Sequence, residues 1–161
     1  SNSSIVTIHG HIWVTGNITV QNSATVKMDA SLGAQNVAII ADNPSDQINS
    51  SIISVKNTAS FQDSGTLGSF IFLISQNKSA ETGGSVEAFS LSNSASALIA
   101  YAAHGLIPLT NNVSLKEVTA YKIILRNSAK VIYDTGLPST VFESGPGGSW
   151  GFIPGTYAIT Q

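Results

Sequence analysis

The chain has 161 residues, 42% of them hydrophobic and only 10% charged, and it contains no cysteine. This length suits one domain (1–161) with a hydrophobic core, and the apolar content argues against disorder despite the many Ser and Asn residues. The net charge of −2 and the single arginine, Arg126, leave no basic footprint for nucleic acid, and the lack of cysteine excludes disulfides and thiolate chemistry.

Residues 1–26 are predicted to form the first coils, or N-terminal cap, of a β structure. Short apolar runs at 5–8, 11–14 and 17–20 predict strands, and Gly10 and Gly16 separate them as turn residues. Trp13 is expected to cover this end, because the open end of a stack of coils otherwise exposes strand edges and an uncovered core.

A short phrase then repeats along the chain: an apolar residue, an Asn near a bend, a small residue and another apolar residue. Its copies centre on Asn22, Asn57, Asn93, Asn111 and Asn127. The first two steps between these positions are each about twice as long as the last two. The spacing therefore predicts coils of roughly 18 residues, with strands at 37–40 and 70–74 where a copy is missing.

The residue types predict an all-β fold, a single-stranded right-handed parallel β-helix with capped ends. Apolar and small polar residues alternate around each Asn, as in a strand with one buried face, and Val, Ile, Thr and Phe dominate the alternating positions. Asn suits a bend between two strands because it tolerates a left-handed backbone. If the coils stack in register, the five Asn side chains are expected to form an internal ladder of amide hydrogen bonds.

Two polar segments interrupt the predicted stack, at residues 41–47 and 76–85. Loops held by a rigid scaffold often carry recognition, so any recognition is expected at these two segments. The favoured interpretation is nevertheless that they are solvated spacers between strands.

The regular pattern is clearest over residues 91–142 and ends in a glycine-rich turn, 143–150. This turn lacks the Lys-Ser/Thr of a phosphate-binding loop, and no helical pattern follows it. Residues 143–161 are therefore predicted to be a C-terminal cap, with Trp150 and Phe152 packed over the last coil.

Catalytic chemistry is weakly represented. Glycoside hydrolysis generally needs two carboxylates that face each other across the sugar. The best pair is Glu117 and Asp134, which are separated by close to one predicted coil and would then be vertical neighbours in the stack. Chance alone supplies one such pair, so the chain is predicted not to be an enzyme. A polysaccharide lyase or glycoside hydrolase is the alternative.

The sequence gives equally little evidence for a metal site or a modification site. His9 and His11 lie on one face of a strand, but His104 is far along the chain, and Asp42 with Asp46 make a poor calcium site. Neither a metal nor another cofactor is predicted. Asn-x-Ser/Thr glycosylation sequons occur at Asn2, Asn17, Asn49, Asn77 and Asn112.

Three stretches resemble a known group of proteins: LKEVTAYKI (115–123), SGPGGSW (144–150) and, near the start, GHIWVTGNIT (10–19). They are similar to the C-terminal β-helical part of large surface proteins from bacteria with reduced genomes, the candidate phyla radiation. Those proteins often begin with a pilin-like or PilX-like membrane helix. The resemblance implies a surface-exposed β-helix and carries over no catalytic residue.

The expected function is therefore a structural or adhesive domain on a cell surface or pilus, part of a longer membrane-anchored protein, with a surface glycan or protein as partner. The sequence itself shows no signal peptide and no apolar run of the roughly 18 residues that a membrane span needs. The alternatives are a carbohydrate-binding or carbohydrate-cleaving β-helix, and a scaffold that polymerises end to end as bactofilins do. Capped ends would oppose polymerisation, because they block pairing between strand edges.

Overall fold

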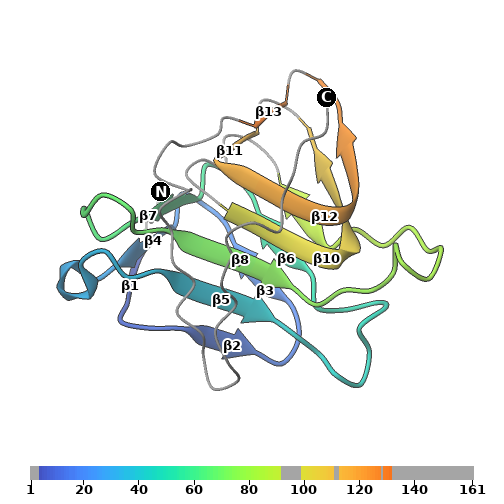
Figure 1. Cartoon of the computed structure of the whole chain (residues 1–161), viewed down its shortest axis with the longest axis horizontal. Coiled ribbons are helices and arrows are strands. Elements are labelled where there is room, and N and C mark those ends of the chain that lie inside the picture. The colour runs from blue at the N-terminus through green and yellow to red at the C-terminus, as the bar shows by residue number, and fades with distance from the viewer. Residues whose placement is uncertain (1–3, 92–98, 111–112, 128, 132–161) are drawn as a thin grey trace, which may run out of the picture.

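The computed structural model describes residues 4–91, 99–110, 113–127 and 129–131, and their regular structure is almost entirely β (Figure 1). One short 3₁₀ helix, η1 (Ala30–Leu32), lies among these residues. The strands are β1 (Ile5–Ile8), β2 (Ile12–Val14), β3 (Ile18–Val20), β4 (Thr25–Met28), β5 (Val37–Ala41), β6 (Ile53–Val55), β7 (Ser60–Gln62), β8 (Ile71–Ser75), β9 (Phe89–Leu91), β10 (Ile99–Leu109), β11 (Ser114–Leu115), β12 (Glu117–Leu125) and β13 (Lys130–Val131). The predicted all-β class is confirmed. No helix among the described residues is long and apolar enough to cross a membrane.

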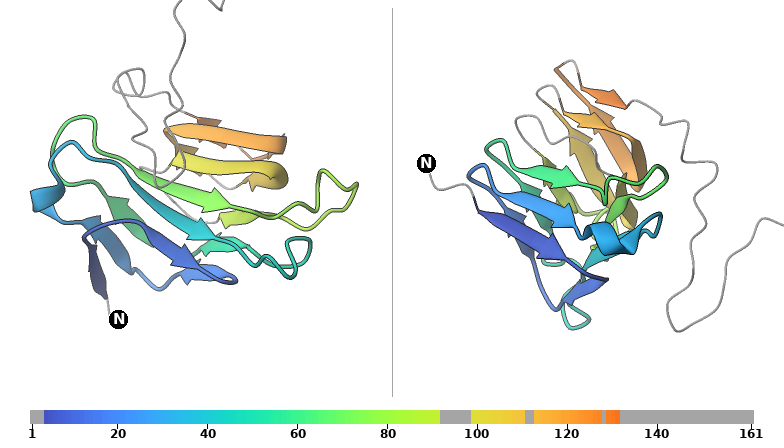
Figure 2. Two further views of the ribbon diagram at one scale, coloured as in Figure 1. Left: turned by 60° about the horizontal axis from the view of Figure 1, so that its bottom comes forward. Right: turned by 90° about the vertical axis from the view of Figure 1, so that its left-hand side faces the viewer.

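Successive strands go to different sheets, and every paired strand is parallel to its neighbours. The sheets have the orders β1-β4-β7, β12-β10-β8-β5-β2, β3-β6-β9 and β11-β13. We call one passage through the first three sheets a circuit: β1–β3 form the first, β4–β6 the second and β7–β9 the third. Figure 2 shows these circuits lying in layers, from the blue N-terminal strands to the orange C-terminal ones.

The long strand β10 continues the stack by serving two sheets. Its first residues pair with β8, and Leu106 then forms a bridge with Glu87, just before β9. The pairing of β10 with β12 shifts register between Ala102 and Leu106, which marks a bulge where the strand turns from one sheet to the other. β12 follows β10 on both sides of this bend.

The circuits differ in length, which corrects the expected uniform repeat. Thr25 pairs with Ser60 and Ile18 with Ile53, each 35 residues on, so no further coil lies between them. Ile107 pairs with Ile123, which is less than half as far along the chain. The expected short coil is therefore wrong for the second and third circuits. These circuits are longer because loops connect their strands at the corners of the stack. The apolar runs at 37–40 and 70–74, which were expected to form separate coils, belong to β5 and β8 of these same circuits.

The core lies between the sheets and is formed by alternate residues of the strands. Val37, Ile39 and Ala41 of β5 are buried, while the intervening residues point to the outer face. The same alternation places Ile53 and Val55 of β6 inside. These side chains join one cluster with residues from the other sheets, and burying each Val, Leu or Ile contributes about 1.5–3 kcal/mol.

Trp13 does not cover the first circuit as expected. Its neighbours Ile12 and Val14 pair with the core residues Ile39 and Ala41, so alternation directs Trp13 to the outer face of the sheet. Its side chain is 65% exposed. The prediction is wrong because a side chain on a strand points to one face of the sheet, and neither face is the end of the stack.

Candidate recognition corner

Two loops, residues 42–52 and 76–86, leave the stack at the same corner, between the five-stranded sheet and the β3-β6-β9 sheet. The first connects β5 to β6 and the second connects β8 to β9, and both extend from one side of the molecule in Figure 1. The backbone N–H of Lys78 donates to the carbonyl oxygen of Gln47 at 2.7 Å, so the loops touch. We call these two loops together with residues 103–105 the loop corner.

Asn77 joins the two loops from inside. Its side chain is fully buried, and Nδ2 donates to the carbonyl oxygens of Ile48 at 3.0 Å and Ser50 at 2.8 Å. Its Oδ1 accepts the N–H of Ser79 at 3.0 Å. A buried amide with this set of partners orders both loops, because each bond that is lost leaves a buried polar group unsatisfied.

The same contacts bear on the glycosylation sequons. The Asn77 nitrogen that would carry a glycan is buried and donates both of its hydrogens. Asn17 and Asn49 are exposed, whereas Asn2 and Asn112 lie outside the described residues. The sequence pattern alone cannot separate these cases, since all of them contain the same three-residue motif.

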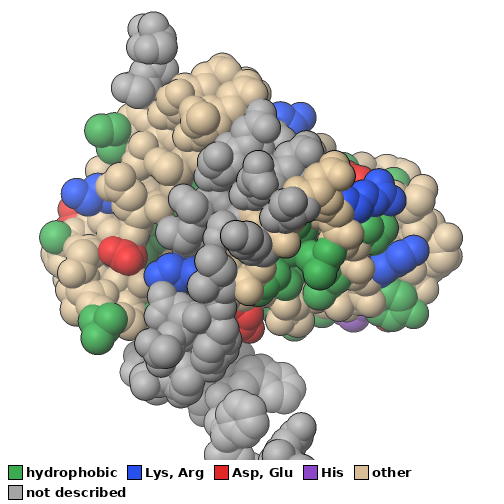
Figure 3. All heavy atoms as spheres, turned by 90° about the horizontal axis from the view of Figure 1, so that it is seen from above, with side chains coloured by type: hydrophobic (Ala, Val, Ile, Leu, Met, Phe, Trp, Pro, Cys, Tyr) green, Lys and Arg blue, Asp and Glu red, His purple; other side chains and the backbone are tan. Residues whose placement is uncertain are grey.

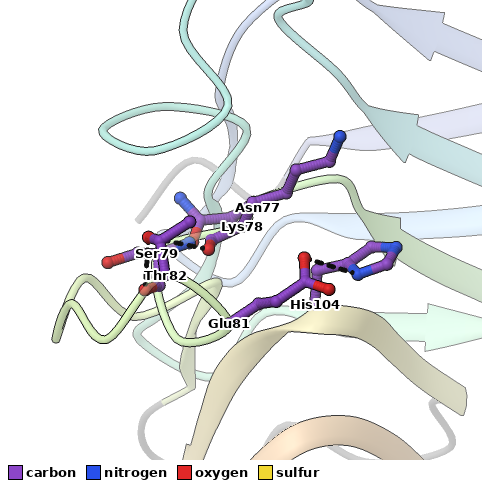
Figure 4. Close-up of polar contacts among 6 residues, drawn as sticks. All are labelled: Asn77, Lys78, Ser79, Glu81, Thr82 and His104. Atoms are coloured by element: carbon purple, nitrogen blue, oxygen red, sulfur yellow. Dashed lines mark hydrogen bonds and ion pairs between the residues drawn. The ribbon is translucent and has the colours of Figure 1, made fainter.

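His104 and Glu81 connect the second loop to β10 (Figure 4). His104 sits in the bulge of β10, and its Nδ1 lies 2.9 Å from Oε2 of Glu81. The backbone repeats the contact, because the Glu81 N–H donates to the His104 carbonyl oxygen at 3.1 Å. The next residue in the bulge is Gly105. A larger residue would clash there, because a Cβ at that position would lie 2.5 Å from the Cβ of Ala88.

The chemistry available at this pair is limited. Glu81 orients the imidazole and leaves Nε2 directed away from the carboxylate, as in a general base that has an orienting partner. A nucleophile must then lie within hydrogen-bond reach of the ring. Among the described residues no Ser or Thr hydroxyl is hydrogen-bonded to His104. Both side chains are more than 40% exposed, so the pair contributes at most about 1 kcal/mol to stability.

The predicted Asn22 and Asn57 lie at a different corner, where the β3-β6-β9 sheet leads into the β1-β4-β7 sheet, and Asn127 lies between β12 and β13. Asn22, Asn57 and Asn127 have left-handed φ values of 59°, 54° and 52°. Asn57 Nδ2 donates to Asn22 Oδ1 at 3.2 Å, and both side chains are exposed. The contact is therefore on the surface and not internal as expected, because the left-handed bend carries the side chain outward. Asn93 and Asn111 lie outside the described residues.

The other predicted residues are dispersed. Glu117 starts β12 beside Ile99, and its predicted partner Asp134 lies outside the described residues. Nδ1 of His11 accepts the N–H of Ala38 at 3.0 Å, and Nδ1 of His9 lies 3.7 Å from Asp29. Within the part of the chain that the structure describes, no three His, Asp or Glu residues gather closely enough to hold a metal ion.

A shallow pocket of about 290 Å³ lies at another corner, between β7 and β8. Asp63, the loop 65–69, Phe70 and Lys116 line it. Asp63 already accepts the N–H of Gly65 at 2.9 Å, and the Lys116 ammonium lies 5.0 Å from the centre of the Phe70 ring. These polar groups have partners within the protein, so this pocket is a weaker candidate site than the loop corner.

Comparison of the chain with protein-family models, curated proteins and solved structures found no match. The sequence predicts both loops, but it does not indicate that Asn77, Glu81 and His104 join them to each other and to β10. The Asn-Lys-Ser sequence was visible only as a glycosylation signal, and Glu81 and His104 are distant in the chain with no pattern that links them.

Proposed function

We propose that the chain is a non-enzymatic structural and adhesive domain, built as a single-stranded right-handed parallel β-helix. Support comes from the strand order, in which each sheet receives one strand per circuit, and from a core to which several sheets contribute. Parallel strands of one sheet that are joined by a crossover connection are right-handed in about 98% of cases, which supports the proposed handedness.

The observation that carries the adhesive role is the convergence of two long loops at one corner of a rigid stack. Asn77, Lys78 and Glu81 tie these loops to each other and to β10. A loop that is ordered before binding loses less conformational entropy when a partner docks, so a surface of this kind suits recognition. Ile48 of the first loop, at 47% exposure, offers an apolar contact at the loop corner, and Glu81 of the second loop is also exposed.

The cell-surface location rests on the resemblance of residues 10–19, 115–123 and 144–150 to β-helical surface proteins of the candidate phyla radiation. In that proposal a pilin-like membrane helix in the same polypeptide anchors the domain. Its partner is a surface glycan or protein of a neighbouring cell.

A glycan array probed with the labelled chain tests the adhesive role. We expect binding to one class of glycan, weakened by Ile48→Ala or Glu81→Ala at the loop corner and unchanged by Lys56→Ala, an exposed residue beside the Asn corner. Retained binding in both loop variants would place the site elsewhere. New reducing ends or unsaturated products from a polysaccharide, abolished by His104→Ala, would contradict the non-enzymatic assignment.

A second candidate function is a scaffold that polymerises end to end. Among the described strands, β1, β2 and β3 of the first circuit each lie at the edge of a sheet, and the core-facing Val6 of β1 is 51% exposed although its partner Val26 is buried. Exposed parallel edges of this kind pair readily with another chain. Electron microscopy of the pure protein separates the two functions, since filaments that form without a partner would favour the scaffold.

A further inference from the structure

The outer face of the five-stranded sheet carries a row of uncharged side chains that crosses all five strands. Register partners in parallel strands point to the same face, and this row lies on the face opposite to the core. We call it the outer row. In the order of the strands in the sheet, its members are paired in turn: Trp13 of β2, Ile40 of β5, Ile74 of β8, Tyr101 of β10 and Thr119 of β12.

The two aromatic members of the outer row are open to solvent on a firm support. Trp13 is 65% exposed and Tyr101 is 41% exposed, while Ile40 and Ile74 between them are half-buried. Ile74 packs against a second apolar cluster, separate from the core, that contains Phe70, Phe72 and Ile99. An aromatic side chain has only two rotatable bonds, so it offers a large contact area at little cost in conformational entropy.

The size of the outer row favours a narrow ligand. If a whole aromatic side chain presents about 150–250 Å², the exposed fractions of Trp13 and Tyr101 together present about 160–260 Å². A stable protein–protein interface buries about 800 Å² on each partner. The row is therefore too small for a stable interface with a folded protein or with a second copy of the chain, and it suits a single polymer chain.

The charges around the outer row favour a neutral ligand. Glu117 lies on the same face two residues before Thr119, and Lys116 lies over the ring of Phe70. These neighbours have opposite charges. Figure 3 looks down on the molecule as drawn in Figure 1, and on its described part the charged side chains are scattered and mixed in sign. An acidic polymer would instead require Lys or Arg side chains grouped along its path.

We propose that the outer row binds a neutral, linear polysaccharide whose pyranose rings stack on Trp13 and Tyr101. A pyranose ring with equatorial hydroxyls presents its C–H bonds on its two faces, and the face of an aromatic ring is electron-rich, so the two attract each other. Strands in a sheet lie about 4.8 Å apart, which places Trp13 and Tyr101 about 14 Å apart across three strand intervals. One oligosaccharide of several sugar residues reaches both rings.

The outer row also lies beside the loop corner. The three segments of that corner, 42–52, 76–86 and 103–105, each begin two residues after a member of the row: Ile40, Ile74 and Tyr101. A chain bound along the row therefore passes the base of both loops. The inference deepens the proposed adhesive role, on which it rests, by naming the class of glycan and the surface that contacts its rings.

Isothermal titration calorimetry of the full chain tests the proposal. The probes are cellohexaose and xylohexaose, which are neutral and have equatorial ring substituents, and polygalacturonate is the acidic comparison. We expect a neutral probe to bind, with Kd raised at least about tenfold by Trp13→Ala and less by Tyr101→Ala. Trp13→Phe should retain part of the affinity because it keeps a ring. Leu67→Ala, at a side chain 90% exposed elsewhere, should change nothing.

Several results would overturn the proposal. These are an unchanged Kd in Trp13→Ala, no heat with either neutral probe, or tighter binding of polygalacturonate. Self-association in sedimentation that Trp13→Ala abolishes would also overturn it and would identify a second copy as the occupant. Circular dichroism melts establish that each variant is folded.

The loop variants separate this inference from the proposed site at the loop corner. Glycan binding that is lost in Ile48→Ala or Glu81→Ala and intact in Trp13→Ala would overturn the outer row and leave the adhesive role at the loops. Binding that is lost in Trp13→Ala and intact in both loop variants would support the outer row and overturn the loop corner as the site.

Discussion

Asn22, Asn57 and Asn127 recur because the bend after β3, the bend after β6 and the bend after β12 each require a residue that accepts a left-handed backbone. Their φ values lie between 52° and 59°, a region that costs most L-residues about 1–2 kcal/mol. Asn reduces this cost because its short amide bonds locally. The exposed hydrogen bond between Asn22 and Asn57 further stabilises two bends whose left-handed backbone already favours Asn.

Replacement of Asn57 separates these two effects. Asn57→Ala is expected to lower the free energy of unfolding by about 1–2 kcal/mol, because Ala is strained at this φ. Asn57→Gly should cost less, since Gly adopts the conformation freely. Urea denaturation measures both values, and equal losses would instead assign the effect to the hydrogen bond with Asn22.

Asp29 links stability to pH. The Ser31 hydroxyl and then the Ser31 backbone N–H hydrogen-bond its carboxylate and lower its pKa below the ordinary 3.8, with a smaller contribution from His9. A lowered folded-state pKa contributes stability above the unfolded pKa, and this contribution is lost as the pH falls through the folded pKa. Asp29→Asn should therefore be less stable than the wild type at neutral pH and converge with it in acid. Parallel thermal melts across the acid range measure this, and a constant difference at every pH would contradict it.

At the scale of the elements, the loops explain how strands 35 residues apart in the chain become neighbours. Each long circuit adds loops at its corners, and the loops do not change which strands pair. The hydroxyls of Thr25 and Ser60 lie 3.0 Å apart across the β4–β7 pair, which is direct contact between consecutive circuits. The short repeat expected from the Asn phrase would instead have brought Thr25 next to Asn43.

Engineered cysteines test this pairing in a chain that has none of its own. Thr25→Cys combined with Ser60→Cys should form a disulfide in the native protein, because adjacent strands lie about 4.8 Å apart, within the range that a disulfide spans. Thr25→Cys combined with Asn43→Cys should remain reduced. Free-thiol counting after mild oxidation distinguishes the two, and the reverse result would restore the short repeat.

For the whole molecule, stability depends on where a residue lies along the stack. Val55 of β6 is fully buried in the middle circuits, while Val6 of β1 is 51% exposed in the first. Val55→Ala is expected to cost about 2–3 kcal/mol, from two lost methyl groups and the cavity that remains.

The matched change Val6→Ala should cost less than about 1 kcal/mol, because half of this side chain already faces water. Urea denaturation of both variants checks the difference. Equal losses would mean that the first circuit is covered as fully as the middle ones.

Local residue patterns were enough to predict the all-β class, the strands and the bends, because alternation and left-handed tolerance are properties of a few adjacent residues. They also located the two polar loops. The spacing of the Asn phrase was interpreted wrongly for the longer circuits, since a loop of any moderate length is compatible with the same strand pairing.

The sequence by itself therefore determined the all-β class, strand-forming segments such as 37–40 and 70–74, and the corners marked by Asn22 and Asn57. Only the tertiary structure decided which strands are neighbours, that Asn77 joins the two loops, and that Glu81 meets His104. The physical reason is that pairing and burial act between residues brought together by the circuits, and distance along the chain does not encode that contact.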